Sequence, residues 1–275
     1  MKKLFVYFAI ISLFSAGAVS CGEDDDVRLS GKPVKIKCSD NTDVTFSYQG
    51  DRPVRITENG FGLTTEFGYS DGDLSSLSSW PTDPIIADGG TISTFTKEAD
   101  GKIRIETIGF FPYSIVRVME QDAGGFPVKI TDEGRYTLDE KGVKKKERDG
   151  EYYSLFSWDA STGQLLKEEV CNIATSQRVA VYTYKYDRAP GVLSGVDSPL
   201  WLYTYWNYGR YFAFGTYHVL FFGHVNNLTE VTVDDTLNDR HEVVKYTYDY
   251  DANGFPVAVS IQKPGAETLT IQIQY

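Results

Sequence analysis

The sequence predicts an all-β protein: a long antiparallel meander that closes into a barrel or a strongly curled sheet. From residue 33 onward, apolar and polar side chains alternate along short runs, which is typical of strands with one buried face. Asp or Asn with Gly separates these runs and supplies the positive-φ residues that hairpin turns require. No helical period intervenes, and an open meander of this length would expose two edges, so we expect the sheet to close.

One phrase organises the chain and is clearest at residues 246–259. It consists of an alternating aromatic strand, a tight Asp-Asn-Gly turn and a returning strand that opens with Phe-Pro-Val. The proline begins the returning strand, where the ladder can spare an amide hydrogen. Similar phrases predict hairpins at 44–56, 67–74, 95–105, 122–130, 136–143, 156–165 and 182–187. We therefore expect a single β domain over 33–275.

The first twenty residues form a predicted signal peptide. Lys2 and Lys3 precede an apolar stretch, 4–14, that is too short to span a bilayer as a mature helix. Small residues then lead directly into Cys21. This arrangement resembles the lipobox of bacterial lipoproteins, which implies that Cys21 becomes the N-terminus and carries acyl chains. The alternative is an ordinary secretory signal with an incidental cysteine.

An acidic stretch, 22–26, follows Cys21 and lies in a predicted tether over 21–32. It resembles the surface-export signal of Bacteroidetes lipoproteins, which implies a lipid-anchored protein on the outer face of the outer membrane. The alternative address is the periplasmic face. A solvated tether would need the same acidic composition.

The net charge limits the classes of partner, and the number of cysteines limits how the fold can be stabilised. The net charge of −11 would repel phosphate backbones, so we expect no nucleic-acid partner. Apart from Cys21, the chain has Cys38 and Cys171, which could form a disulfide in an oxidising envelope or serve as two buried small apolar residues. Two cysteines cannot staple a chain of this length, so a hydrophobic core must hold the fold.

An aromatic segment near 199–223 interrupts the alternation. It contains Arg210 and His218, which argue against a transmembrane helix. Its aromatics are too dense for one face of a strand or helix, so we expect a plug or cover for the curled sheet. The segment is either plain core or an aromatic-lined ligand cleft. In the second case the candidate contacts are Trp201, Tyr205, Trp206 and Tyr208.

We find no motif that predicts catalysis, a cofactor or a metal. Asp249, Asp251 and Asn253 have the opening spacing of a calcium loop, but Ser260 stands where the loop needs a bidentate Glu. A hairpin turn explains the same residues. The tripeptide around Thr236 resembles the O-glycosylation motif of Bacteroides secreted proteins, which implies a glycan acceptor at Thr236.

The hairpin phrases resemble two families. One is the YD repeat of RHS and teneurin-like proteins. The other is a family of Bacteroidetes lipoproteins of unknown function, DUF4595, described as having a porin-like β-barrel. The second resemblance also covers the lipobox, the acidic stretch and the aromatic segment before 226–229, and we prefer it. This resemblance implies the fold and the cellular location of the protein, and it implies no catalytic residues.

The function we expect is binding of a glycan or another envelope ligand at the cell surface. One alternative is a structural outer-membrane component that contacts protein partners through sheet edges or the barrel wall. Another is a glycoside hydrolase, which would need two carboxylates facing each other across a groove.

Overall fold

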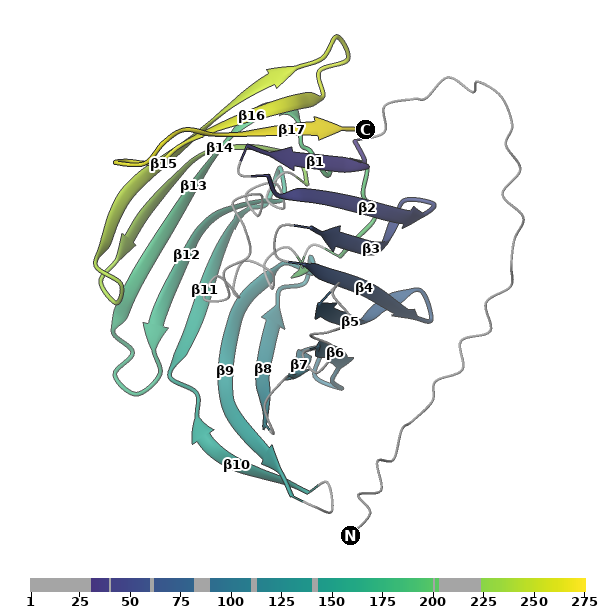
Figure 1. Ribbon diagram of the computed structural model, residues 1–275. Coiled ribbons are helices and arrows are strands. Elements are labelled where there is room, and N and C mark those ends of the chain that lie inside the picture. The colour runs from purple at the N-terminus through teal and green to yellow at the C-terminus, as the bar shows by residue number, and fades with distance from the viewer. Residues whose placement is uncertain are drawn as a thin grey trace, which may run out of the picture.

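The structure is a computed structural model, and it describes residues 31–39, 41–59, 62–81, 90–109, 113–139, 143–199, 201–202 and 224–275. A wall of curved strands surrounds the interior (Figure 1). The strands are β1 Lys35–Cys38, β2 Asp43–Gln49, β3 Arg52–Glu58, β4 Leu63–Ser70, β5 Asp73–Pro81, β6 Thr91–Lys97, β7 Ile103–Ile108, β8 Tyr113–Gln121, β9 Pro127–Leu138, β10 Lys144–Asp149, β11 Tyr152–Asp159, β12 Gln164–Asn172, β13 Arg178–Pro190, β14 Asn226–Asp235, β15 Arg240–Tyr250, β16 Pro256–Gln262 and β17 Leu269–Gln274.

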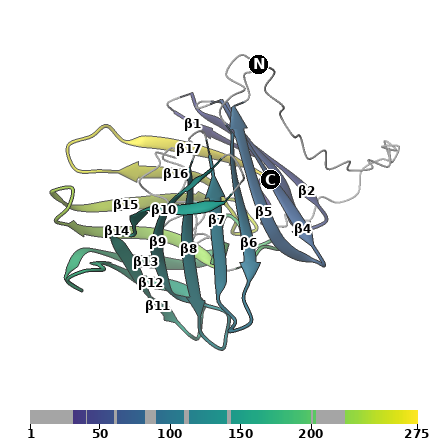
Figure 2. The ribbon, with the colours of Figure 1, turned by 90° about the horizontal axis from the view of Figure 1, so that it is seen from below.

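The wall is a closed antiparallel meander, as the sequence predicts. Consecutive strands pair along the chain, except that β11 pairs with β9 instead of β10, and β1 joins β17 through the register Lys35↔Gln274 and Cys38↔Ile271. Both β10 and β11 pair with the same strand, β9. They therefore share one position, and the described strands make a sixteen-strand barrel. Figure 2, a view from below, follows the same order round the wall.

The inner face of the wall is mostly apolar, with buried polar residues such as Ser93, Ser154 and Glu168 among the apolar side chains. Neighbouring strands place Ile36 beside Val44, and Phe95 beside Ile105, and these side chains belong to one continuous buried cluster. The alternation of buried and less buried residues along β2 and β6 follows the two-residue period of a strand. Burial of this lining is the main force that holds the barrel together.

The outer face is predominantly polar. One row of adjacent outward residues crosses β2 to β5, and a second crosses β13 to β16. The rows are Ser47, Arg55, Glu66 and Ser78, and Lys185, Glu230, Lys245 and Gln262. Cross-strand ion pairs join Arg55 to Glu66 and Lys185 to Glu230. Exposed apolar residues such as Ile92 and Ile108 interrupt the polar surface locally.

Most copies of the recurring phrase place their turns at one rim of the barrel, whereas the copy at 136–143 follows β9 and lies at the opposite rim. In the two copies with Gly-Phe-Pro-Val, an aspartate carboxylate accepts two backbone N–H groups. Asp122 Oδ1 accepts from Gly124 at 2.9 Å and Phe126 at 3.0 Å, and Asp251 Oδ1 accepts from Asn253 and Phe255 at 2.9 and 2.8 Å. The glycines that close these turns have φ of 82° and 83°. Aspartate caps the turn and glycine supplies its left-handed residue.

Beside this rim, bulges and ring hydrogen bonds fix the strands. The register shifts immediately before Tyr48, Tyr69, Trp158 and Tyr186, each of which stands just before a turn or loop at this rim. The polar group of each ring donates to a backbone carbonyl near the adjacent strand, at 2.6–2.9 Å. A bulge increases local twist and bends the strand. The repeated phrase thus encodes both a turn and the curvature beside it.

The basic run at 144–146 lies on β10, where every residue is exposed. In the part of the chain that the structure describes, no helix has the length and apolar character needed to cross a bilayer.

The buried carboxylate of Asp235, only 1% exposed, gives a stability prediction. Burial alone would raise its pKa, but hydrogen bonds from Asn238, Tyr182 and Leu237 hold the pKa below its usual value. A lowered folded pKa stabilises the barrel above the ordinary carboxyl pKa of about 3.9, and the effect is lost as the pH falls through the folded value.

We therefore expect Asp235→Asn to lower the free energy of unfolding by about 1–3 kcal/mol at neutral pH. The difference from the wild type should narrow in acid. Urea unfolding at neutral pH and near pH 3 measures both, with the exposed Asp249→Asn as control. A difference that stays constant with pH would contradict this role for the Asp235 charge.

Candidate functional site

The segment after β13 turns inward at the rim that carries the phrase turns. Asn227, fully buried at the start of β14, accepts the N–H of Val192 at 3.0 Å and donates to the carbonyl of Pro190 at 2.9 Å. Val192 and Leu193 then join the core cluster. An amide side chain in the wall therefore fixes where the segment leaves it.

Asp197 clasps this segment to the turn between β2 and β3. Its N–H donates to the carbonyl of Asp51 at 2.8 Å, and its Oδ2 lies 3.0 Å from Arg52 Nε. The Arg52 guanidinium also stands 5.6 Å from the ring centroid of Tyr69. Both partners of the ion pair are largely exposed, so the clasp positions the segment more than it stabilises the barrel.

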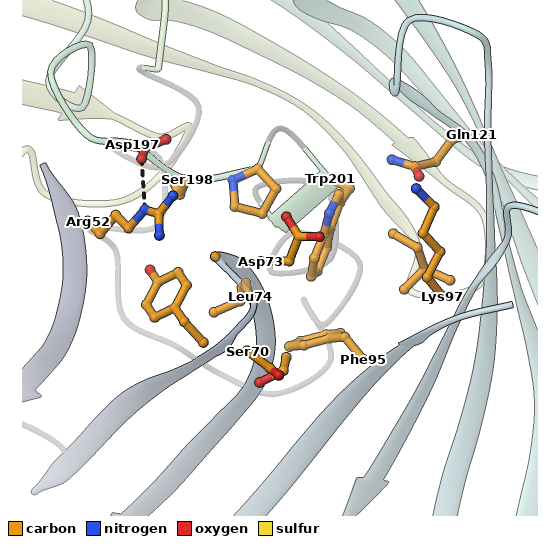
Figure 3. Close-up of a pocket in the computed structure, with 15 residues that line it drawn as sticks. Arg52, Ser70, Asp73, Leu74, Phe95, Lys97, Gln121, Asp197, Ser198 and Trp201 are labelled. Atoms are coloured by element: carbon orange, nitrogen blue, oxygen red, sulfur yellow. Dashed lines mark hydrogen bonds and ion pairs between the residues drawn. The ribbon is translucent and has the colours of Figure 1, made fainter.

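A cavity of about 500 Å³ opens between this segment and the rim, and we call it the rim pocket. Its volume lies in the range of small-molecule sites. Figure 3 shows Arg52 and Asp197 on one side, Lys97 and Gln121 on the opposite side, and Asp73 and Trp201 between them. The lining comprises Arg52, Tyr69, Ser70, Gly72, Asp73, Leu74, Ser75, Phe95, Lys97, Ile103, Gln121, Asp197, Ser198, Pro199 and Trp201.

The apolar floor of the rim pocket is an aromatic pair. The ring centroids of Trp201 and Phe95 lie 4.7 Å apart with an interplanar angle of 58°. Both residues belong to the core cluster, and Trp201 is only 9% exposed. Trp201 is thus both core and pocket lining, and it presents a limited part of its ring to a ligand.

Polar side chains from four hairpins surround the floor. Asp73 begins β5, Lys97 ends β6, and Gln121 ends β8. Gln121 Nε2 donates to the Gly125 carbonyl at 2.7 Å, which fixes its amide beside the turn. Burial raises the pKa of Tyr69 to about 12 against the opposing effect of Arg52. Its hydroxyl stays protonated at neutral pH and donates to Pro53 at 2.8 Å.

Of the four aromatics predicted to contact a ligand, the structure places Trp201 in the rim pocket. Tyr205, Trp206 and Tyr208 lie outside the described residues, as does Cys21. Trp201 and Leu202 are buried in the core, in agreement with the start of the predicted plug.

The remaining predicted positions lie away from the rim pocket. Cys38 on β1 and Cys171 on β12 are both buried, lie on strands that are not neighbours and are not joined by a disulfide. Thr236 is exposed in the turn after β14, and its hydroxyl donates to the Val179 carbonyl at 2.7 Å. Glycan attachment there stays a prediction. Within the described ranges, no group of three or more His, Cys, Asp or Glu side chains is placed to hold a metal ion.

Sequence reasoning missed most of the polar lining, namely Arg52, Asp73, Lys97 and Gln121. These residues come from separate hairpins, and only barrel closure brings them together. One signal was present, because each stands in or beside a copy of the phrase. Residues in those copies of the phrase whose turns lie at one rim could therefore have been predicted to line a common site.

Two solved structures resemble this chain. A porin-like protein from Bacteroides uniformis ATCC 8492 shares 14% sequence identity with a TM-score of 0.39, and the match covers 88% of this chain and 97% of that chain. A porin-like protein from Bacteroides vulgatus ATCC 8482 shares 11% identity with a TM-score of 0.38, over 89% and 98% of the two chains. No model of a known protein family matches the chain, and no curated protein matches it. Likenesses at this level carry no inference about function.

Because Trp201 belongs both to the core and to the pocket lining, we expect truncation of its side chain to lower the free energy of unfolding strongly. Trp201→Ala should lower the free energy of unfolding by about 3–5 kcal/mol because it opens a cavity against Phe95. Trp201→Phe should cost less than Trp201→Ala, because it keeps an aromatic ring against Phe95 and leaves a smaller cavity. Urea unfolding of the full chain in detergent measures both. Trp80→Ala on the outer face is the matched control, and an equal loss in Trp80→Ala and Trp201→Ala would contradict the assignment.

Proposed function

We propose that this chain is a lipid-anchored binding protein of the outer membrane that captures a hydroxyl-rich glycan in the rim pocket. The rim pocket is the observation that carries the proposal. It offers carboxylates that accept hydrogen bonds, cations that donate them, and an amide and hydroxyls that do both, around an aromatic floor. This combination matches a sugar ring, which has polar edges and apolar faces.

The charges of the rim pocket support an uncharged ligand. Arg52 is ion-paired with Asp197, and Lys97 and Asp73 contribute opposite charges to the same cavity. No single sign dominates the lining, so hydrogen bonds rather than net attraction would orient the ligand. Aromatic side chains at the floor add contact area with little conformational freedom to lose.

The outer wall supports attachment through Cys21 instead of insertion of the barrel. A barrel that spans a membrane carries an apolar band between aromatic girdles on its outward face. Here the outward rows across β2 to β5 and β13 to β16 consist of charged, hydroxyl or amide side chains. A barrel of this kind beside the bilayer needs an anchor, and the lipobox resemblance at Cys21 supplies one. Surface exposure belongs to the same proposal, on the acidic stretch at 22–26.

Assembly through a sheet edge is less well supported. The described wall closes through β1 and β17, and β10 is the strand that extends along β9 beyond the pairing of β11. It carries Lys144, Lys145 and Lys146, all exposed. Lysines on such a strand oppose pairing with another chain.

Hydrolysis of a glycan is likewise less well supported. Asp73 and Asp197 both line the rim pocket. A glycosidase needs one carboxyl kept protonated in an apolar setting. Asp197 is exposed and ion-paired with Arg52 instead.

The binding proposal predicts saturable sugar binding that depends on the polar lining. Full-length chain in detergent micelles should show a saturable change of tryptophan fluorescence with at least one member of a panel of neutral, acidic and amino oligosaccharides. Asp73→Ala and Lys97→Ala should each weaken binding about tenfold, since each removes hydrogen bonds worth about 1–2 kcal/mol.

The matched controls are Lys37→Ala and Asp249→Ala on the outer face, which should bind as the wild type does. All four positions are exposed, so unfolding free energies should stay within about 0.5 kcal/mol of one another. Silence toward the whole panel, or undiminished binding by the Asp73 and Lys97 variants, would overturn the proposal.

A further inference from the structure

The folded domain begins at the rim that holds the rim pocket. The carbonyl of Gly31 accepts the N–H of Gly195 at 3.1 Å, two residues before Asp197. Lys32 forms a 2.7 Å ion pair with Asp51, whose carbonyl accepts the N–H of Asp197. The start of the domain is therefore bonded to the same clasp that borders the pocket.

The end of β17 lies beside the start of β1 at this rim (Figure 1). The turns after β2, β4, β6 and β8, which contribute lining residues, meet there as well. The opposite rim carries other turns, including the one between β16 and β17. The point where the tether joins the barrel and the mouth of the rim pocket thus share one end.

The reach of the tether is short. Gly31 follows Cys21 by ten residues, and a fully extended chain spans at most about 3.3–3.6 Å per residue, or roughly 35 Å in all. The longest strand, β13, is roughly 40 Å along its own path, and because barrel strands tilt by roughly 35–45° the wall is about 30 Å high. Since the tether joins the barrel at the pocket rim, an acyl group on Cys21 would hold that rim nearer to the bilayer than the opposite rim.

From this placement we propose that the pocket ligand is carried by the membrane itself, as the sugar headgroup of a lipid in the bilayer that holds the anchor. The inference rests on the proposed function and adds the source of the glycan. A ligand held in the same bilayer has a high effective concentration at the mouth, so a pocket of modest intrinsic affinity would be occupied.

The charges near the mouth favour a sugar headgroup over an anionic phospholipid headgroup. The turns around the pocket carry Asp71, Asp100 and Asp122, and the tether carries the acidic stretch 22–26. A phosphate brought to this end would meet these carboxylates, while of the nearby cations Arg52 is paired with Asp197, Lys102 with Asp100, and Lys97 shares the lining with Asp73. A hydroxyl-rich headgroup meets no such repulsion.

Orientation can be measured without knowing the ligand. Ala160, in the turn after β11, is exposed at the pocket rim, and Ala266, in the turn after β16, is exposed at the opposite rim. Ala160→Cys and Ala266→Cys in the acylated full chain would each carry one donor fluorophore, since Cys38 and Cys171 are buried. In phosphatidylcholine vesicles with a headgroup-labelled acceptor lipid, energy transfer should be clearly stronger from residue 160. Equal or stronger transfer from residue 266 would overturn the inference.

The ligand source is tested with three probes on the vesicle-bound chain. These are vesicles of phosphatidylcholine alone, vesicles that also contain the glycolipid fraction of a bacterial outer membrane, and the deacylated headgroups of that fraction in solution. The proposal predicts a tryptophan response to glycolipid in the same vesicle that is lost in Asp73→Ala and kept in Asp249→Ala. Deacylated headgroups should require at least about a hundredfold higher concentration, the gain expected from confinement to one surface.

A long flexible insertion between Asp26 and Val27 should weaken the tryptophan response to glycolipid in the same vesicle. The tryptophan response to free headgroups should stay unchanged. An equal response to free headgroups would overturn the membrane source while leaving the proposed function standing. Silence toward all three probes would overturn this inference, and the separate oligosaccharide panel then decides whether the proposed function fails with it.

Discussion

An apolar lining inside so wide a barrel must be filled, and the rest of this structure depends on that requirement. Eight strands enclose a space that side chains can fill, whereas about sixteen leave a channel unless something occupies it. Here the lining is hydrophobic, so a water-filled channel would expose it. Val192, Leu193, Trp201 and Leu202 join the wall residues in one buried cluster. The described parts of the segment after β13, 191–199 and 201–202, thus contribute to the core and border the rim pocket.

Alternation and turn chemistry were enough to predict strands, hairpins and a closing meander, because both are local properties of the chain. The pairing of β1 with β17 and the clustering of Asp73, Lys97 and Gln121 are not local. They depend on how far each hairpin bends, which the bulges before Tyr48, Tyr69, Trp158 and Tyr186 set. The aromatic density near Trp201 did predict one pocket residue, since a segment without a strand period has to pack on more than one side.

The phrase that repeats along the sequence gives one rim a distinctive character. Its aspartates cap turns, its aromatics tie bulged strands to their neighbours, and its polar residues face the mouth of the pocket. At the opposite rim Asp139 and Asp235 also cap turns, but these turns do not line the rim pocket. An antiparallel meander brings every second turn to the same end of the barrel. A repeat that encodes a hairpin can therefore bring its polar turn residues together at one site.

We propose a barrel that has its apolar face inside and its polar face outside and that lipid alone holds to the membrane. Fractionation of cells that express the Cys21→Ser chain beside the wild type tests this proposal most directly. We expect the variant to fold, to lose residues 1–20 and to remain in the aqueous supernatant after lysis without detergent, while the wild type sediments with the membrane. A folded Cys21→Ser chain that has lost residues 1–20, as its intact mass would show, and yet stays in the membrane through a carbonate wash would overturn the proposal, because its wall would then have to face lipid.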